Sequence, residues 1–277
     1  MFIDQIEQRI SVRTYQPKSL NPNDKLKIVE ILEQSKKSVG PFGSSIHPFF
    51  VEQDKINEQE KIGTYGFVKN APAFFGASTK NARLELIDFG YLFEKLILEF
   101  TDLNLGTVWL GGTFHRSQFD SFITEDQFIP AISPIGYEEN KSFTEKVIRI
   151  AAKSDRRKPI NLFVFGAKFS NLNDEQIHQL TPIFRYVQLA PSASNKQPWR
   201  FIVDDHMIHL YLEKTVGYAD RLPFEIQYLD MGIAICHLEY ALLDTNIKYK
   251  MKLLPQDAIK TSYEYIISFI LEKSIIS

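Results

Sequence analysis

Residues 191–199 read PSASNKQPW, and a diverged version of this stretch, PFGSSIHPF, occupies residues 41–49. In both places a helical pattern runs into a proline, a loop of small and polar residues follows, and a second proline leads into an aromatic and β-branched run. Each unit therefore predicts a helix, a loop and a strand in that order. A chain that carries such a unit twice is expected to form two related halves.

The similarity extends outward from the two loops. Asn21 and Asn23 precede the first predicted helix as Asn171 and Asn173 precede the second, and asparagine favours the N-cap position. Helical spacing is shown by Leu26, Val29, Ile31 and Leu32 in one copy and by Ile177, Leu180, Ile183 and Val187 in the other. Chance similarity between two amphipathic helices is the alternative, and the unchanged order of the matching prolines argues against it.

A second pair of matching segments lies further along the chain. Asp88 and Gly90 in LIDFGYLFEKLILEF match Asp230 and Gly232 in YLDMGIAICHLEYALL. Both segments are apolar on most faces, which predicts buried central helices that pack on each other. We expect the two aspartates to cap or pack these helices rather than to act as acids in catalysis.

These patterns predict an α+β fold with two diverged copies of a mixed sheet flanked by helices. The first copy is assigned to residues 1–160 and the second, shorter copy to 161–277, with intertwined terminal segments. The run TSYEYIISFILEK at residues 261–273 is amphipathic and predicts a tail helix that embraces the other copy, with membrane association as the alternative.

Composition excludes several classes of protein. Lysine and arginine number 32 against 34 acidic residues, so the net charge of −2 provides no field for nucleic acid or anionic lipid. The N-terminal residues MFIDQIEQR lack the pattern of a signal peptide, and no run approaches the ~20 apolar residues of a membrane span, so we expect a cytoplasmic protein. The single cysteine, Cys236, excludes an internal disulfide and is expected to be a buried thiol rather than a reactive one.

Two clusters of polar residues suggest ligand binding. In RISVRTY, the alternating Arg9, Ser11 and Arg13 bring two guanidiniums and a hydroxyl together, which suits a phosphate or a polarised carbonyl, although such stretches are often solvated surface. In the PSASNKQPW loop, small side chains allow backbone amides to approach a planar ligand. Donors and acceptors for the ring edge are offered there by Ser192, Ser194, Asn195 and Gln197. A polar turn in which Trp199 merely packs is the alternative.

Two further clusters are less specific by themselves. In NLGTVWLGGTF, Gly106 is expected to end a helix, residues 108–110 to form a strand, and Gly111 and Gly112 to let backbone approach a ligand. In KSDRRKP, at residues 153–159, the basic side chains either neutralise a phosphate or belong to a linker between the copies.

Taken together, the four clusters resemble the FMN-dependent nitroreductase family. That family has an N-terminal arginine motif, a P-S-x-x-N-x-Q-P-W loop, a G-(L/T)-x-W-(I/L)-G strand and a terminal R-K-P. Its two subunits interlock and bind flavin at their interface, with the loop supplied by the partner subunit. Here the first copy keeps RISVRTY, GTVWLGG and RRKP but has Phe42 and Ser45 in its loop, whereas the second copy keeps only the loop. The chain thus resembles a fused, internally duplicated branch that acts as its own dimer.

The resemblance implies a role for each matching residue. Arg9 and either Arg156 or Arg157 would hold the FMN phosphate, Ser11 would support the ribityl chain, and Arg13 would face the N1/C2 edge of the ring. Approach to the ring from the second copy is implied for Ser192, Ala193, Ser194 and Asn195. Room for the flavin against backbone is implied at Leu110, Gly111 and Gly112.

The implied activity is transfer of electrons from NADH or NADPH through FMN to a small electron-poor acceptor such as a nitroaromatic or a quinone. No catalytic acid or nucleophile is nominated, and the histidines lack metal-binding spacing. We expect one competent site per chain and no obligate partner chain. The alternatives are an FMN sensor or storage protein whose substrate face is closed by Phe42 or Phe114, and other flavin chemistry such as dehalogenation or flavin fragmentation.

Overall fold

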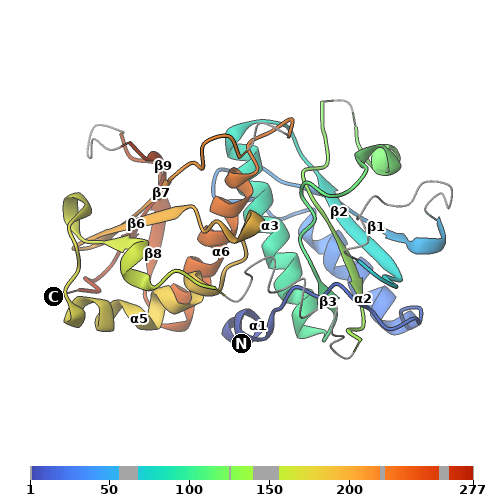
Figure 1. Ribbon diagram of the computed structural model, residues 1–277, viewed down its shortest axis with the longest axis horizontal. Helices are drawn as coiled ribbons and strands as arrows, with labels where there is room; N and C mark the ends of the chain where they lie inside the picture. Colours follow the sequence, from blue (N-terminus) through green and yellow to red (C-terminus); the bar gives the residue numbers. More distant parts are fainter. Residues whose placement is uncertain are drawn as a thin grey trace.

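The computed structural model describes residues 2–55, 68–124, 126–139, 156–218, 222–255 and 262–276, and the structural statements below concern these residues. Two helix-and-sheet units lie side by side, with the N-terminus between them and the C-terminus at one outer end (Figure 1). We call the unit whose sheet lies within residues 47–136 the first half, and the unit whose sheet lies within 164–271 the second half.

The two halves share one order of elements. The first half contains α2 (Pro22–Ser35), β1 (His47–Glu52), β2 (Ala73–Ser78), α3 (Arg83–Asp102), β3 (Gly106–Thr107) and β4 (Ile132–Gly136). The second half contains α5 (Asp174–Leu189), β6 (Trp199–Asp204), β7 (Met207–Leu212), α6 (Gln227–Asp244), β8 (Tyr249–Lys252) and β9 (Glu264–Leu271). Outside this shared order lie α1 (Phe2–Gln8), β5 (Val164–Phe165) and the 3₁₀ helices η1 (Gln53–Lys55), η2 (Arg116–Phe122), η3 (Ile160–Leu162), η4 (Ala167–Phe169) and η5 (Ala193–Asn195).

The sheets also have the same topology. The strand order is β1-β2-β4-β3 in the first half and β6-β7-β9-β8 in the second, where β5 adds to the edge of β6. All neighbours are antiparallel except β5 and β6, which are parallel. Equal element order and equal strand order confirm the predicted α+β fold with two diverged copies in one chain.

The loops that follow α2 and α5 lead into strands as the sequence predicts. Asn21 caps α2 by accepting a hydrogen bond from the Asp24 amide at 2.8 Å, and Asn173 caps α5 in a capping box with Gln176. The copies therefore use different asparagines of the aligned pairs. Because α1 packs on α3, α5 and α6, the first few residues contact both halves, and the boundary expected at residue 160 stays a prediction.

The helix predicted from Leu26, Val29, Ile31 and Leu32 is α2, which confirms that prediction. Its buried face is another matter, because Leu26 and Val29 are 58% and 42% exposed, whereas Ile28 and Leu32 face the core. The contacts of α2 with α3 and β1 select that face, and the apolar pattern alone did not identify it. The predicted tail helix within residues 261–273 is the strand β9, which pairs with β7 and β8. Its consecutive buried residues produce an apolar run without a clear period.

A further expectation is only partly met. The strand predicted at residues 108–110 lies earlier, at Gly106–Thr107, and the chain rejoins the sheet only through a bridge between Leu110 and Ile132. The Val108 amide instead donates to the Ser133 hydroxyl at 3.0 Å, which interrupts the ladder between these points.

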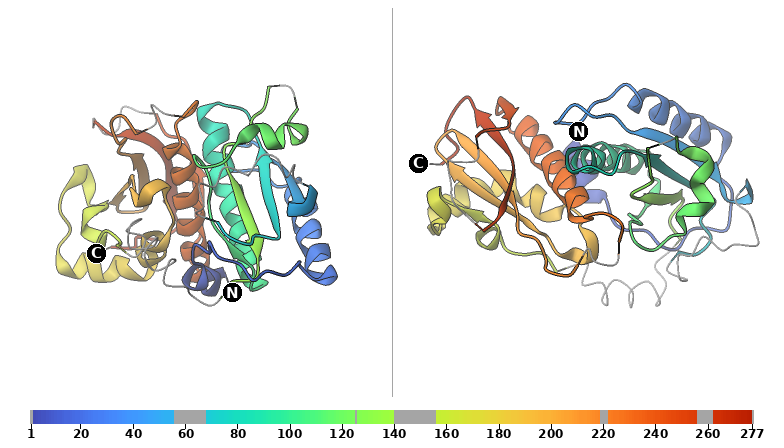
Figure 2. Two further views of the ribbon diagram at one scale, coloured as in Figure 1. Left: turned by 45° about the vertical axis from the view of Figure 1, so that its right-hand side comes forward. Right: turned by 90° about the horizontal axis from the view of Figure 1, so that it is seen from above.

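The central helices α3 and α6 lie side by side where the halves meet (Figure 2). They touch through the matching glycines. A Cβ added to Gly90 would lie 2.2 Å from the Leu229 carbonyl oxygen, and one added to Gly232 would lie 2.0 Å from that of Ile87. Only glycine permits backbone to approach backbone at this distance, so the repeated Asp-x-Gly pattern marks the crossing point of the two helices.

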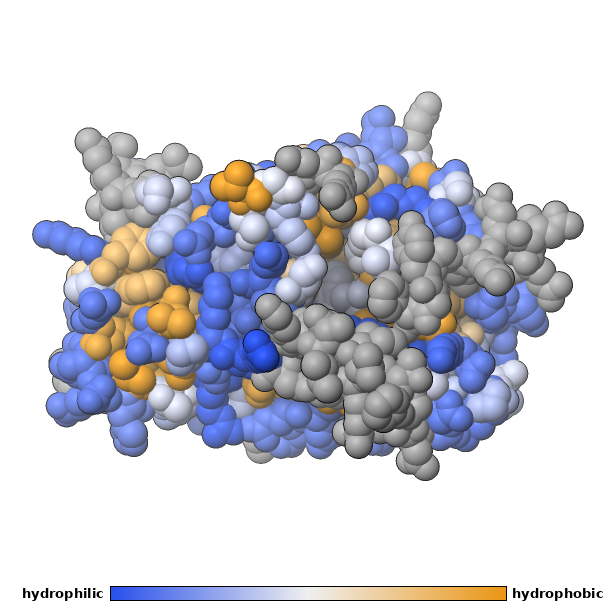
Figure 3. All heavy atoms as spheres, viewed as in Figure 1, coloured by the Kyte–Doolittle hydropathy of each residue, from blue (hydrophilic) through white to orange (hydrophobic). Residues whose placement is uncertain are grey.

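The surface is mainly polar, as expected when most apolar residues lie in the core. Figure 3 shows a largely hydrophilic face, with hydrophobic residues gathered over the half that carries the second sheet. Within the described residues, no helix combines the length and the apolar character needed to cross a membrane.

We predict that Gly232→Ala lowers the free energy of unfolding by about 3 kcal/mol or more, because the atoms that the new methyl group meets are backbone atoms of α3. Urea denaturation measures this loss. Gly112→Ala is the control, since its methyl group would lie an ordinary 3.6 Å from the Leu222 side chain, and we expect a change within about 0.5 kcal/mol. Equal stability of the two variants would contradict the close crossing.

Candidate functional site

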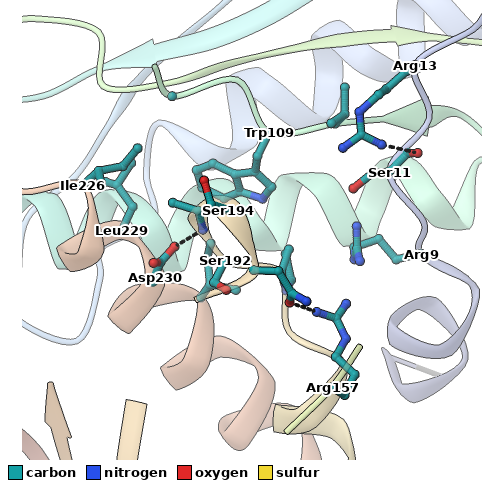
Figure 4. A pocket seen from close by; sticks show the side chains of 16 residues that line it. Arg9, Ser11, Arg13, Trp109, Arg157, Ser192, Ser194, Ile226, Leu229 and Asp230 are labelled. Carbon is teal, nitrogen blue, oxygen red and sulfur yellow. Dashed lines mark hydrogen bonds between the residues drawn. The ribbon is translucent and has the colours of Figure 1, made fainter. Parts of the chain in front are cut away.

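A cavity lies where the two halves meet, and both halves line it (Figure 4). The first half contributes Arg9, Ser11, Arg13, Val108, Trp109 and Gly111. The remaining lining residues are Arg157, Pro191, Ser192, Ala193, Ser194, Asn195, Ile226, Leu229, Asp230 and Ile233. The sequence clusters that were singled out separately therefore meet at one place in the fold.

The arginine motif forms an extended segment beside β3. Ser11 forms a parallel bridge with Thr107, and the Val12 amide donates to the Thr107 carbonyl at 2.8 Å. Extended backbone alternates its side chains between two faces. Val12 is accordingly buried, and a Cβ on Gly106 would lie only 2.8 Å from it. Arg9, Ser11 and Arg13 face the cavity instead.

The proline loop of the second half is held in an unusual backbone conformation. Ser194, Asn195 and Gln197 have positive φ values of 48°, 53° and 49°. The Asn195 side chain binds the Arg157 guanidinium at 2.7 Å and the Arg156 carbonyl at 2.7 Å. Left-handed residues are sustained only when their surroundings fix them. These side-chain contacts hold the loop in shape, so Asn195 has a structural role besides its position on the cavity wall.

A buried polar network lies behind the cavity. Glu94 of α3 accepts a hydrogen bond from the Trp109 indole at 2.7 Å, its other carboxyl oxygen lies 2.9 Å from His237 Nε2 of α6, and the Arg9 guanidinium lies 3.9 Å away. The Glu94 and His237 side chains are fully buried. Polar groups at this depth must satisfy one another, so the network fixes the position of Trp109 relative to the central helices.

The contacts of His237 fix the orientation of its ring. His237 Nδ1 lies 2.9 Å from the Tyr186 carbonyl oxygen, which can only accept, so Nδ1 carries a proton. The other ring nitrogen, Nε2, faces Glu94 Oε1 at 2.9 Å. The imidazole on α6 therefore joins α5, which carries Tyr186, to α3, which carries Glu94.

The two ends of the cavity differ in character. The guanidiniums of Arg9, Arg13 and Arg157 lie toward one end, and Ile226, Leu229 and Asp230 lie toward the other (Figure 4). Burial raises the pKa of Asp230 well above its usual range, the hydrogen bond from the Ala193 amide opposes this, and the negative charge of Glu225 adds to it. One end thus suits an anionic group, and the other suits an uncharged, largely apolar one.

Three of the nominated residues do not line the cavity. Leu110 is buried in the cluster around Phe119, and Gly112 faces Leu222. The Arg156 side chain is exposed, and the contact of Arg156 with the site is its carbonyl, which accepts from Asn195. Gly111 does line the cavity, but a Cβ there would lie 2.9 Å from Ile226 Cδ1, so this glycine makes room for a side chain of the other half.

Sequence reasoning did not find Glu94, His237 or the apolar end of the cavity. The sequence feature that could have indicated Glu94 and His237 is the presence of an acidic residue and a histidine inside helices that are apolar on most faces. Burial of such residues requires partners, but the sequence did not show that they partner each other across the two copies. No group of metal-binding side chains is found among the residues that the structure describes.

Known proteins resemble this chain in both sequence and fold. The profile of a family described as "Putative TM nitroreductase" matches residues 2–242. A crystal structure from Thermotoga maritima, described as a putative nitroreductase, is 20% identical, covers 98% of this chain and 93% of its own chain, and superposes with a TM-score of 0.60. That superposition supports the fold alone. A search of curated proteins finds no match.

Other solved structures match about half of the chain. A nitroreductase family protein from Clostridium novyi is 19% identical, with a TM-score of 0.38, and covers 50% of this chain and 86% of its own. A nitroreductase with bound FMN from Bacteroides fragilis is 20% identical, with a TM-score of 0.41, and covers 51% of this chain and 90% of its own.

We predict that Glu94→Ala lowers the free energy of unfolding by about 3–5 kcal/mol, because it strands buried groups on Trp109 and His237. Glu94→Gln is the matched control. Its amide oxygen can accept from Trp109 while its amide nitrogen donates to His237 Nε2, and we expect a loss of about 1 kcal/mol or less. Chemical denaturation followed by tryptophan fluorescence measures both variants. Equal losses in the two would show that the hydrogen bonds do not fix the network.

Proposed function

The chain belongs to the family described as "Putative TM nitroreductase", and from that premise we propose that it is an FMN-dependent NAD(P)H oxidoreductase. In this proposal electrons pass from NADH or NADPH through FMN to a small electron-poor acceptor such as a nitroaromatic or a quinone. The observation that carries the proposal is the cavity between the halves, where the arginine motif of one half faces the proline loop of the other.

The residues of the cavity fit the chemistry of FMN. The cofactor joins a doubly charged phosphate to a planar, mostly apolar ring. Guanidiniums bind phosphate oxygens through paired hydrogen bonds, and three of them gather toward one end of the cavity. The apolar end, with Ile226 and Leu229, suits part of a ring system. The charged and the apolar side chains thus lie at separate ends of the cavity, as the phosphate and the ring of FMN require.

When bound, FMN supplies the redox chemistry, taking up a hydride and passing electrons on. The role of the protein is to bind, orient and tune it. Arg13 would stabilise negative charge at the edge of the ring, and the buried Glu94–His237 pair would keep Trp109 and Arg9 in place. No side chain is assigned as a proton donor or nucleophile for the electron transfer itself.

We propose one such site per chain, in a monomer that needs no partner subunit. The aligned loop of the first half has Phe42 and Ser45 where the second half has Ser192 and Asn195. In place of the arginine motif the second half has Pro159, Asn161 and Phe163. Neither of the phenylalanines considered as plugs, Phe42 and Phe114, lines the cavity, which favours a site open to a second substrate over a closed storage site.

The test is the flavin content of the purified protein and its reduction. We expect the protein to copurify with, or take up, about one FMN per chain, and we expect NADH or NADPH to bleach the flavin absorbance anaerobically. Addition of a nitroaromatic or a quinone should restore it. Bound flavin that stays oxidised with both donors would contradict reductase activity, and two flavins per chain would contradict the single site.

We predict that Arg157→Ala weakens FMN binding about 10- to 100-fold, the loss expected for one charged hydrogen-bonding group. Arg156→Ala is the neighbouring comparison. It removes a side chain that points to solvent and keeps the carbonyl that binds Asn195, so we expect a change of less than about threefold. Dissociation constants from the quenching of FMN fluorescence decide between the two arginines. A larger loss for Arg156→Ala would reverse the assignment.

A further inference from the structure

The two halves use their matching aspartates differently. In the first half, Asp88 accepts from the Phe42 amide through Oδ1 at 2.9 Å and from the Ser44 amide through Oδ2 at 2.8 Å. In the second half, the one hydrogen bond that Asp230 accepts from a described residue comes from the Ala193 amide, through Oδ1 at 2.9 Å. Its Oδ2 is buried and has no hydrogen-bond partner among the residues that the structure describes.

The residue before the loop also differs between the halves. In the first half that residue is Gly40, and a Cβ there would lie 2.3 Å from Asp88 Oδ1, so the carboxylate occupies the space that a methyl group would need. The second half has Ala190 at the aligned position. Ala190 thus carries a methyl group at the position where Gly40 leaves room for Asp88. The oxygen of Asp230 without a partner lies in the half whose loop lines the cavity.

The surroundings of Asp230 are unfavourable for a charge. Asp230 is 2% exposed and lies toward the end of the cavity marked by Ile226 and Leu229, away from the arginines (Figure 4). Glu225 acts on it with a charge of the same sign, and burial raises its pKa well above the usual range for an aspartate. An isolated buried carboxyl relieves this cost by holding a proton, and that proton is then available to donate.

We propose that Asp230 is a ligand-binding residue of the site: as an uncharged carboxylic acid, it donates a hydrogen bond from Oδ2 to a carbonyl oxygen or ring nitrogen of the planar molecule in the cavity. The inference rests on the proposed function, because the planar molecule is the ring of the flavin. It adds a specificity: this end of the site selects an uncharged hydrogen-bond acceptor and disfavours a hydrogen-bond donor.

Substitution of Asp230 by asparagine distinguishes a hydrogen-bond donor at this position from an ionised carboxylate, which can only accept. In Asp230→Asn, the amide oxygen can accept from the Ala193 amide while the amide nitrogen takes the place of the donating hydroxyl. We therefore expect its affinity for FMN to stay within about threefold of the unmodified protein. Asp230→Leu has neither group, and we expect it to lose about tenfold or more. Loss of affinity in Asp230→Asn as large as in Asp230→Leu would overturn the proposal.

The pH dependence of FMN binding provides a second test, which does not require a disruptive variant. Ionisation of Asp230 removes the donor and sets a negative charge against an acceptor atom. Affinity of the unmodified protein should therefore fall as the pH rises through the raised pKa of Asp230, while Asp230→Asn should not show that component. Within the part of the chain that the structure describes, Glu225 and Tyr218 are the charged and titratable groups that interact with Asp230, and both proteins share them. Identical pH profiles would overturn the proposal.

Infrared difference spectra test whether the Asp230 carboxyl is protonated, and stability measurements test its hydrogen bonding. A protonated carboxyl band that disappears in Asp230→Asn is expected, and its absence would overturn the proposal. Asp88→Asn is the matched control in the other half. It must give up one of two amide hydrogen bonds, so its urea midpoint should fall while that of Asp230→Asn is kept.

These outcomes also distinguish the two proposals. If the unmodified protein binds no FMN, the proposed function and the ligand assigned to Asp230 fail together, and the infrared band still decides whether the acid is protonated. If it binds FMN but Asp230→Asn behaves like Asp230→Leu, only the inference about Asp230 fails.

Discussion

The contact between α3 and α6 at Gly90 and Gly232 is the constraint on which the rest of the structure depends. It brings two helix backbones together so closely that neither glycine can carry a Cβ. Each glycine follows an aspartate by two positions, and that aspartate binds amides of the proline loop in its own half. The crossing therefore fixes both loops relative to each other. It also sets the arginine motif of the first half opposite the loop of the second half.

The two halves are related by duplication, but a few equivalent positions near the cavity hold different residues. Glu94 and His237 lie four and five positions after the crossing glycines, where the other helix has Cys236 and Lys95. The buried acid–histidine pair consequently forms on one side of the crossing, beside Arg9 and Trp109. The matching aspartates differ in the same way, because Asp88 binds two loop amides, whereas Asp230 Oδ2 has no partner among the described residues. Asymmetry of the site thus originates in residues behind its wall as well as in those that line it.

Local signals in the sequence predicted much of this, and their limits are physical. Prolines, capping asparagines and the Asp-x-Gly repeat each act through nearby backbone, so they identified the loops, the helices and the duplication. The solvent-facing Leu26 and the strand in place of a tail helix depend on which neighbours a segment meets. The Glu94–His237 pair joins residues that are far apart in the chain, and no local pattern links them. The grouping of the arginine motif with the proline loop was predicted only through resemblance to a family.

The central claim is that both halves build one cavity for one flavin, and a crystal structure of the protein with FMN bound tests it most directly. The account predicts the phosphate beside Arg9 and Arg157, and the ring between Trp109 and the loop that begins at Pro191. FMN held by residues of one half alone, or bound beside the loop that Asp88 caps, would contradict it.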